Sequence, residues 1–196
     1  MMCGPLASAM FNHFLPVHKG LRDKGFNFCD PEVFANILSV YKKFPEHELT
    51  EEMVARFVNR KGEAREYLKD LLICRFSMIP VCFMDHWILA ILQMKYTKEC
   101  KDIRARLIVV DSLLNSTSHK HRTEIRAVTT YRAIGLALKA ALQLGNSRYA
   151  LGKYTLVRVE KMPCQTNGYD GGFYMTLFAE TLATYSSWRV SLYKII

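Results

Sequence analysis

The sequence predicts an α+β fold, from three observations. Helical apolar patterns dominate the first half, three apolar strand-like runs follow between residues 76 and 110, and a helix, a strand and a last helix complete the chain. The 196 residues are 50% hydrophobic, enough to bury one sizeable core, and no repeat or Pro/Gly/Ser-rich linker divides them. We therefore expect a single domain over residues 1–196.

The first half of the chain carries three helical patterns. Asp30-Pro31 supplies an N-cap followed by proline at the first helical position, so a helix of about three turns should end near Phe44-Pro45. Thr50-Glu51-Glu52 predicts a second helix start, because it combines a capping hydroxyl with acids in the first turn. Gly62 should end or interrupt that helix, and Glu63–Leu72 forms the third pattern.

A change of pattern at Phe76 predicts successive strands. The runs Met78–Phe83, Trp87–Met94 and Arg104–Val110 are largely apolar and compatible with strands. Met84-Asp85 should form a short turn between the first two strands. The polar stretch Lys95–Asp102 should connect the second to the third.

The last third of the chain should add a helix, a strand and a helix. Glu124–Leu144 has apolar residues at helical spacing, whereas Tyr154–Val159 alternates as a strand does. Phe173–Tyr185 is a predominantly apolar helical pattern. Because it is apolar on most sides, we expect that helix to be central and buried.

The formal net charge of +9 is compatible with an acidic partner, with nucleic acid or with solubility alone. Basic residues occur in scattered groups: Lys19, Arg22 and Lys24; Arg56, Arg60, Lys61 and Arg65; Lys120, Arg122 and Arg126. Because no arginine-rich run or nucleic-acid motif accompanies them, nucleic acid is not the favoured partner. The apolar stretch Ala133–Gly145 is too short to span a membrane, and no secretory signal is recognisable. We expect an intracellular protein.

The cysteines and histidines give no sign of a metal or cofactor site. Six cysteines, at positions 3, 29, 74, 82, 100 and 164, lack paired C-x-x-C spacing and are expected to be reduced thiols. His119 and His121, with Cys100 earlier in the chain, have no matched second pair of ligands. We read them as part of a solvated loop.

Three short motifs give the strongest indication of function in the chain. They are His86-Trp87, Val110-Asp111-Ser112-Leu113 and the stretch from Gln165 to Gly172, which reads Gln-Thr-Asn-Gly-Tyr-Asp-Gly-Gly. In this order and spacing the chain resembles the Ulp1/SENP family, whose members carry His-Trp, Asp-Ser-Leu and Gln-x(5)-Cys-Gly elements and process SUMO-like modifiers. Gly171 stands six residues after Gln165, where the family has its nucleophilic cysteine.

The resemblance implies a papain-like fold, with a mixed central sheet flanked by helices and a central helix starting at Gly171. His86 would act as the general base, Asp111 would orient its imidazole, and Gln165 would donate to the oxyanion. Gly171 has no side-chain nucleophile, so the chain is expected to be inactive as written. Cys164 lies before the loop and cannot replace the thiol.

Substrate contacts are implied for Trp87, Asp170 and Gly172. In the family, the tryptophan after the histidine covers a tunnel for the modifier's Gly-Gly tail; the alternative is that Trp87 is a core aromatic. The family's second tunnel tryptophan, from the N-terminal part, has no counterpart here, because the only other tryptophan is Trp188. Asp111 follows His86 by 25 residues, a longer interval than is usual in the family.

Three functional hypotheses follow. The first is a pseudoprotease that binds a ubiquitin-like modifier, or another protein, without cleaving it. The second is an active processing or deconjugating protease, acting after a C-terminal Gly-Gly, in which Gly171 is an engineered knockout. The third is a basic structural scaffold in a nucleic-acid or protein assembly. The SUMO resemblance suggests a nuclear location.

Overall fold

The computed structural model describes residues 25–43, 62–97, 101–114, 120–144, 148–159, 162–167 and 170–184. The elements in chain order are β1 (Phe26–Phe28), α3 (Pro31–Lys43), α5 (Gly62–Ile73), β2 (Phe76–Phe83), β3 (His86–Thr97), β4 (Asp102–Val110), α6 (Lys120–Leu144), β5 (Ala150–Arg158) and α7 (Gly171–Thr184). The predicted α+β class is confirmed. The helix expected to start at Thr50 lies outside the described residues.

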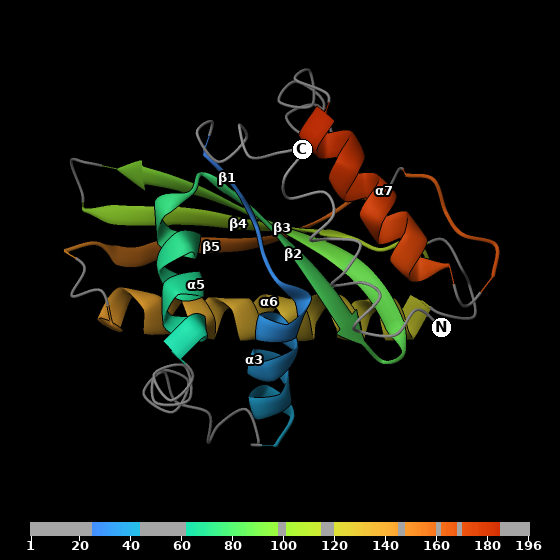
Figure 1. The fold of residues 1–196 in the computed structure, drawn as a ribbon, viewed down its shortest axis with the longest axis horizontal. Coiled ribbons are helices and arrows are strands. Elements are labelled where there is room, and N and C mark those ends of the chain that lie inside the picture. The colour runs from blue at the N-terminus through green and yellow to red at the C-terminus, as the bar shows by residue number, and fades with distance from the viewer. Residues whose placement is uncertain are drawn as a thin grey trace.

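The five strands form one mixed sheet in the order β1-β2-β3-β4-β5. The outer pairs, β1 with β2 and β4 with β5, are parallel, while β2–β3 and β3–β4 are antiparallel. Figure 1 shows α7 on one side of this sheet and α3 and α6 on the other. Sequence periodicity does not predict β1, because three residues are too few to show an alternating pattern.

The β2–β3 hairpin turns where the sequence predicts. Met84 and Asp85 both have positive φ angles, 54° and 59°, as a two-residue hairpin turn requires. The polar connection expected over Lys95–Asp102 is shorter than predicted, because residues 95–97 of β3 pair with residues 102–104 of β4. Strands tolerate polar residues where one face of the sheet is open to solvent.

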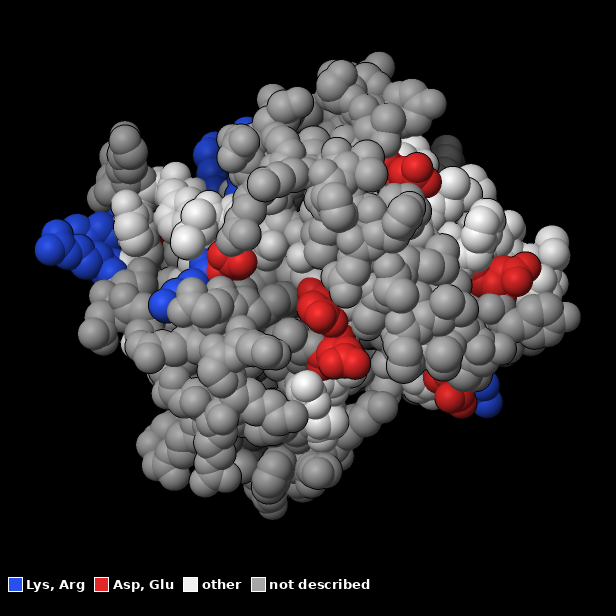
Figure 2. Space-filling view, in the orientation of Figure 1, with Lys and Arg blue, Asp and Glu red and all other residues white. Residues whose placement is uncertain are grey.

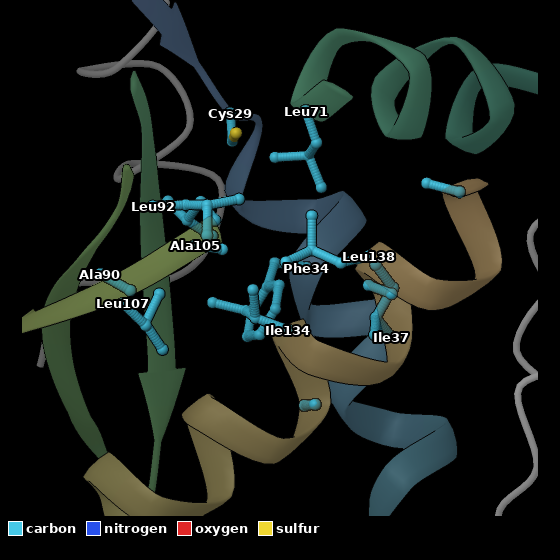
Figure 3. Close-up of a cluster of buried hydrophobic side chains, with 14 of the residues drawn as sticks. Cys29, Phe34, Ile37, Leu71, Ala90, Leu92, Ala105, Leu107, Ile134 and Leu138 are labelled. Carbon is cyan, nitrogen blue, oxygen red and sulfur yellow. The ribbon is translucent and has the colours of Figure 1, made fainter. Parts of the chain in front are cut away.

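Away from the β3–β4 turn, hydrophobic side chains cover both faces of the sheet. On one face, alternate residues of β3 and β4 pack against α3, α5 and α6; Figure 3 shows part of this cluster, including Phe34, Leu92, Leu107 and Leu138. On the other face, the intervening strand residues join Met175 and Ala179 of α7. This two-sided burial explains why the strands read as nearly continuous apolar runs.

Two tyrosines fix α6 against β5. The rings of Tyr131 and Tyr154 stack with centroids 4.3 Å apart, and each hydroxyl donates to the backbone carbonyl of the other residue. A β-carbon at Gly135 would lie 2.9 Å from Tyr154 Cε1, so glycine is what permits this close approach. The contact also sets the position of the preceding turns of α6, which reach the candidate site.

The last helix begins at Gly171, as predicted, and packs on the sheet over β3. The expectation that it is buried on most sides is wrong, since Phe173 and Leu177 are 56% and 41% exposed. An all-round apolar sequence does not reveal which face will pack, and only contact with the sheet decides it. Within the ranges given above, no helix combines the length and apolar character needed to cross a membrane.

Candidate active site

The hairpin geometry brings His86 and Asp111 together. His86 is the first residue of β3, and Asp111 directly follows the last residue of β4. Because these strands are antiparallel neighbours, the start of one and the end of the other lie at the same edge of the sheet. His86 Nε2 lies 2.8 Å from Asp111 Oδ1, and both side chains are buried.

Asp111 accepts hydrogen bonds on both of its carboxylate oxygens. The Leu113 backbone N–H donates to Oδ1 at 2.9 Å, and Arg126 Nε donates to Oδ2 at 3.0 Å. Arg126 Nη2 lies 2.9 Å from the same Oδ2 and also donates to Thr123 Oγ1 at 3.1 Å. The Arg126 guanidinium, the His86 ring and the Leu113 backbone N–H together hold the carboxylate in its ionised form.

Opposing effects set the pKa of Asp111. Burial is the largest single influence and raises the pKa. The hydrogen bond from His86 and its charge lower the pKa, and so do the charge of Arg126 and the Leu113 N–H. Together these interactions outweigh burial, and the pKa lies below its usual value of 3.8.

Arg126 is the main site residue that sequence reasoning missed. Grouped by charge, it belongs with Lys120 and Arg122, but it is 1% exposed. The feature that could have indicated its burial is its position in the helix. Arg126 lies on the same face of α6 as Thr123 and Thr130, which are buried. A cation on the buried face of an amphipathic helix requires an anionic partner, and here that partner is Asp111.

A pH dependence follows from Asp111. Its folded-state pKa is lowered, so the stability it contributes is present above the usual value of 3.8 and is lost as pH falls through the folded value. We expect the free energy of unfolding to fall more steeply on acidification for the parent chain than for Asp111→Asn, measured by urea denaturation between about pH 3 and 6. Asp85→Asn, which removes an exposed carboxyl group, is the control; a parent-like slope in Asp111→Asn would contradict the assignment.

The other imidazole nitrogen of His86 faces Gly171. A β-carbon at Gly171 would lie 2.6 Å from His86 Nδ1 and 2.7 Å from Cε1. Nδ1 is buried and makes no hydrogen bond within the described part of the chain. When the ring is neutral and its Nε2–H donates to Asp111, Nδ1 is an acceptor. A base is thus placed beside position 171, where the family resemblance predicts the nucleophile, and glycine allows the ring to approach more closely than a side chain would.

Gln165 is held by Ser112, the residue after Asp111. The Ser112 hydroxyl donates to Gln165 Oε1 at 2.6 Å, and the Gln165 backbone N–H donates to the Ser112 carbonyl at 3.0 Å. Gln165 Nε2 donates to the Asn167 carbonyl at 2.5 Å, which uses one of its two hydrogens. Donation of the second hydrogen to an oxyanion stays a prediction. The orienting role of Ser112 is not evident from the sequence, in which it is only a neighbour of the aspartate.

The loop before α7 is closed by Asn167 and Asp170. Asn167 Nδ2 donates to Asp170 Oδ2 at 2.5 Å, and the Asp170 backbone N–H donates to Asn167 Oδ1 at 3.0 Å. Gly172 is buried, and its carbonyl accepts from Thr176 Oγ1 at 2.8 Å. The Asp170 side chain therefore shapes the loop, and its implied substrate contact stays a prediction.

Trp87 lies in the hydrophobic cluster beneath α7. It is 5% exposed and packs with cluster members that include Val110 and Met175. This burial supports the alternative of a core aromatic, and the role of Trp87 as a tunnel cover stays a prediction. Contact with a modifier tail would require Trp87 to become exposed. Trp188 lies outside the described residues.

The cysteines that the structure describes do not place a thiol at position 171. Cys164 Sγ donates to the Met162 carbonyl at 3.4 Å. In the sequence, Cys164 precedes the loop that leads to Gly171. Among the described residues, none of Cys29, Cys74, Cys82 and Cys164 forms a disulfide. Among the described residues, no three His, Cys, Asp or Glu side chains gather as metal ligands; His119 and Cys100 fall outside those ranges.

Comparison with known proteins assigns the family. Residues 21–192 match the family model described as the Ulp1 protease family, C-terminal catalytic domain. The chain belongs to the Ulp1 protease family. No curated protein sequence matches it.

The fold of this Ulp1-family chain is similar to that of a solved protease. A crystal structure described as that of the de-sumoylating protease superposes with a TM-score of 0.60 at 11% sequence identity. The match covers 96% of this chain and 64% of that one, so the chain spans less than two thirds of the solved protein's length. At this identity the likeness shows the fold, and the expected α+β cysteine-protease architecture is confirmed.

Proposed function

We propose that this chain is a single Ulp1-like domain that binds a ubiquitin-like modifier of the SUMO class, or another protein, without cleaving it. The observation that carries the proposal is Gly171, which lies beside His86 Nδ1 but has no nucleophilic atom. Removing a triad nucleophile lowers the rate by about 10⁶-fold in a well-studied serine protease. A base, its orienting acid and an oxyanion donor therefore remain without a group to attack the carbonyl.

The remaining groups would serve the family's chemistry if a thiol were present. His86 Nδ1 would take the thiol proton, and Asp111 would hold the Nε2–H and stabilise the resulting imidazolium. The thiolate would attack the carbonyl carbon of a peptide or isopeptide bond after a Gly-Gly tail. Gln165 Nε2 would donate to the developing oxyanion, a contribution of about 2.7–4 kcal/mol in a comparable site.

Family membership supports a modifier as the partner. The solved relative is a de-sumoylating protease, and its fold matches almost the whole of this chain. Three features support a tail-binding site here: the buried His86–Asp111 pair, the Ser112–Gln165 hydrogen bond and the closed loop before α7. Binding without cleavage is the activity that these features support best.

The test restores the nucleophile. Gly171→Cys should form a covalent adduct with SUMO or ubiquitin bearing a C-terminal thiol-reactive group, detected by a gel shift and mass spectrometry. Adding His86→Ala should slow labelling by about 10²–10⁴-fold, because the general base is removed. Gly171→Ala is the matched control, since it carries the same β-carbon without a thiol and should not react.

Both Gly171 variants should lose about 1–3 kcal/mol of stability, because the β-carbon displaces the His86 ring.

Binding by the parent chain completes the test. Calorimetry should detect the same modifier that labels Gly171→Cys, and deletion of the modifier's Gly-Gly tail should weaken that binding. No labelling of a folded Gly171→Cys variant, together with no binding by the parent chain, would overturn the proposal. Cleavage by the parent chain would refute its inactivity. A cysteine codon at position 171 of the source gene would support an active protease carrying a knockout.

A further inference from the structure

The end of the sheet that α7 leaves open carries four cations on one face. Lys95 of β3, Arg104 and Arg106 of β4, and Lys153 of β5 are all exposed. With Gln93 and Thr155 they line a hollow of about 440 Å³, which we call the basic sheet groove. In Figure 2, most of the visible Lys and Arg side chains lie on the left, the end where the β3–β4 hairpin lies in Figure 1.

Strand register places like charges against one another in the groove. Lys95 is the direct cross-strand partner of Arg104, on the same face of an antiparallel pair, and Arg106 lies two residues further along that face. Like charges in directly opposite positions destabilise a sheet. Among the described residues, none of the four cations forms an ion pair with a carboxylate; Asp102, on the same face of β4, packs beside Gly152. The fold gains no stability from this arrangement, whereas an anionic ligand would neutralise it.

The spacing of the cations fits an extended acidic polypeptide. Arg104 and Arg106 are alternate residues of one strand and so lie about 6.8 Å apart along it. Carboxylates at alternate positions of an extended peptide have the same spacing, and each can pair with a guanidinium through two hydrogen bonds. No aromatic side chain is among the described residues that line the groove, whereas single-stranded nucleic acid is commonly bound by stacking on aromatic rings.

We infer that the basic sheet groove docks an extended, Asp/Glu-rich segment of a protein partner. The pair Leu89–Val110 lies next to the His86–Asp111 site. The pair Lys95–Arg104 lies six strand residues further along, a distance of about 20 Å. The groove is therefore separate from the His86–Asp111 site, and the inference does not depend on what binds there. A partner with an acidic segment can be held at one end of the sheet irrespective of chemistry at the other.

The test uses a fluorescent twelve-residue peptide of alternating Glu and Ser, titrated with the full chain at low salt and followed by anisotropy. Arg104→Gln/Arg106→Gln should weaken its binding by about tenfold or more, because two charge-assisted interactions are lost. Lys120→Gln/Arg122→Gln removes the same charge from exposed positions of α6 and should change binding by about twofold or less. A peptide with Gln in place of Glu should not bind, and added salt should weaken the Glu peptide.

A stability measurement checks the groove independently. Arg104→Gln should raise Tm by about 1–3 °C, because it relieves the repulsion by Lys95.

Equal weakening of peptide binding by the two double variants would overturn the inference in favour of diffuse attraction by net charge. Tighter binding of a twelve-nucleotide single strand, lost in Arg104→Gln/Arg106→Gln, would overturn it in favour of nucleic acid.

Discussion

Replacing Arg126 by alanine should lower the free energy of unfolding by about 3–5 kcal/mol. The guanidinium is buried, and both Nε and Nη2 contact Asp111 Oδ2. Without it, the Asp111 carboxylate stays in the interior with one oxygen deprived of its donors, which is the costly way to break a buried ion pair. Urea denaturation followed by circular dichroism measures the loss.

The matched control for this variant is Arg122→Ala, one turn earlier on α6. Arg122 is exposed, so its replacement should change the free energy of unfolding by about 0.5 kcal/mol or less. A second variant, Arg126→Ala/Asp111→Ala, should be less destabilised than the sum of its two single variants, because no charge is left unpaired. Equal, small effects of Arg126→Ala and Arg122→Ala would show that the buried pair does not form.

Trp87→Ala should also destabilise the chain by about 3–5 kcal/mol, the usual cost of deleting a large aromatic from a core. Trp87 is almost wholly buried between the sheet and α7, where it contacts the cluster that includes Met175. Its removal would leave a cavity directly beneath the helix that begins at Gly171. Thermal and urea unfolding of the purified variant measure the effect.

Two further variants distinguish a core role from a surface role. Trp87→Phe retains a ring and should lose less stability than Trp87→Ala. Phe173→Ala, on the exposed side of α7, should change the free energy of unfolding by about 0.5 kcal/mol or less. If Trp87→Ala kept its stability but lost modifier binding, Trp87 would instead be the cover of a tail tunnel.

The sequence by itself determined the fold class, most of the elements and the pairing of His86 with Asp111. These features depend on local patterns: apolar periodicity, a proline after an N-cap, and a two-residue turn directly before His86. Given antiparallel strands, the order of the motifs along the chain is sufficient to bring the two side chains to one edge. The prediction that position 171 is the nucleophile position rests on motif spacing together with the family resemblance.

Only the tertiary structure decided the remaining features, because each depends on residues far apart in the chain. Arg126 is grouped with surface cations until α6 places it against Asp111, and Ser112 becomes an orienting residue only when the loop carrying Gln165 reaches it. The exposed face of α7 is decided by which side of the helix packs on the sheet. The Lys95–Arg104 pair is decided by the register of β3 and β4. Composition and periodicity specify what a segment can form, whereas packing and register decide which side chains meet.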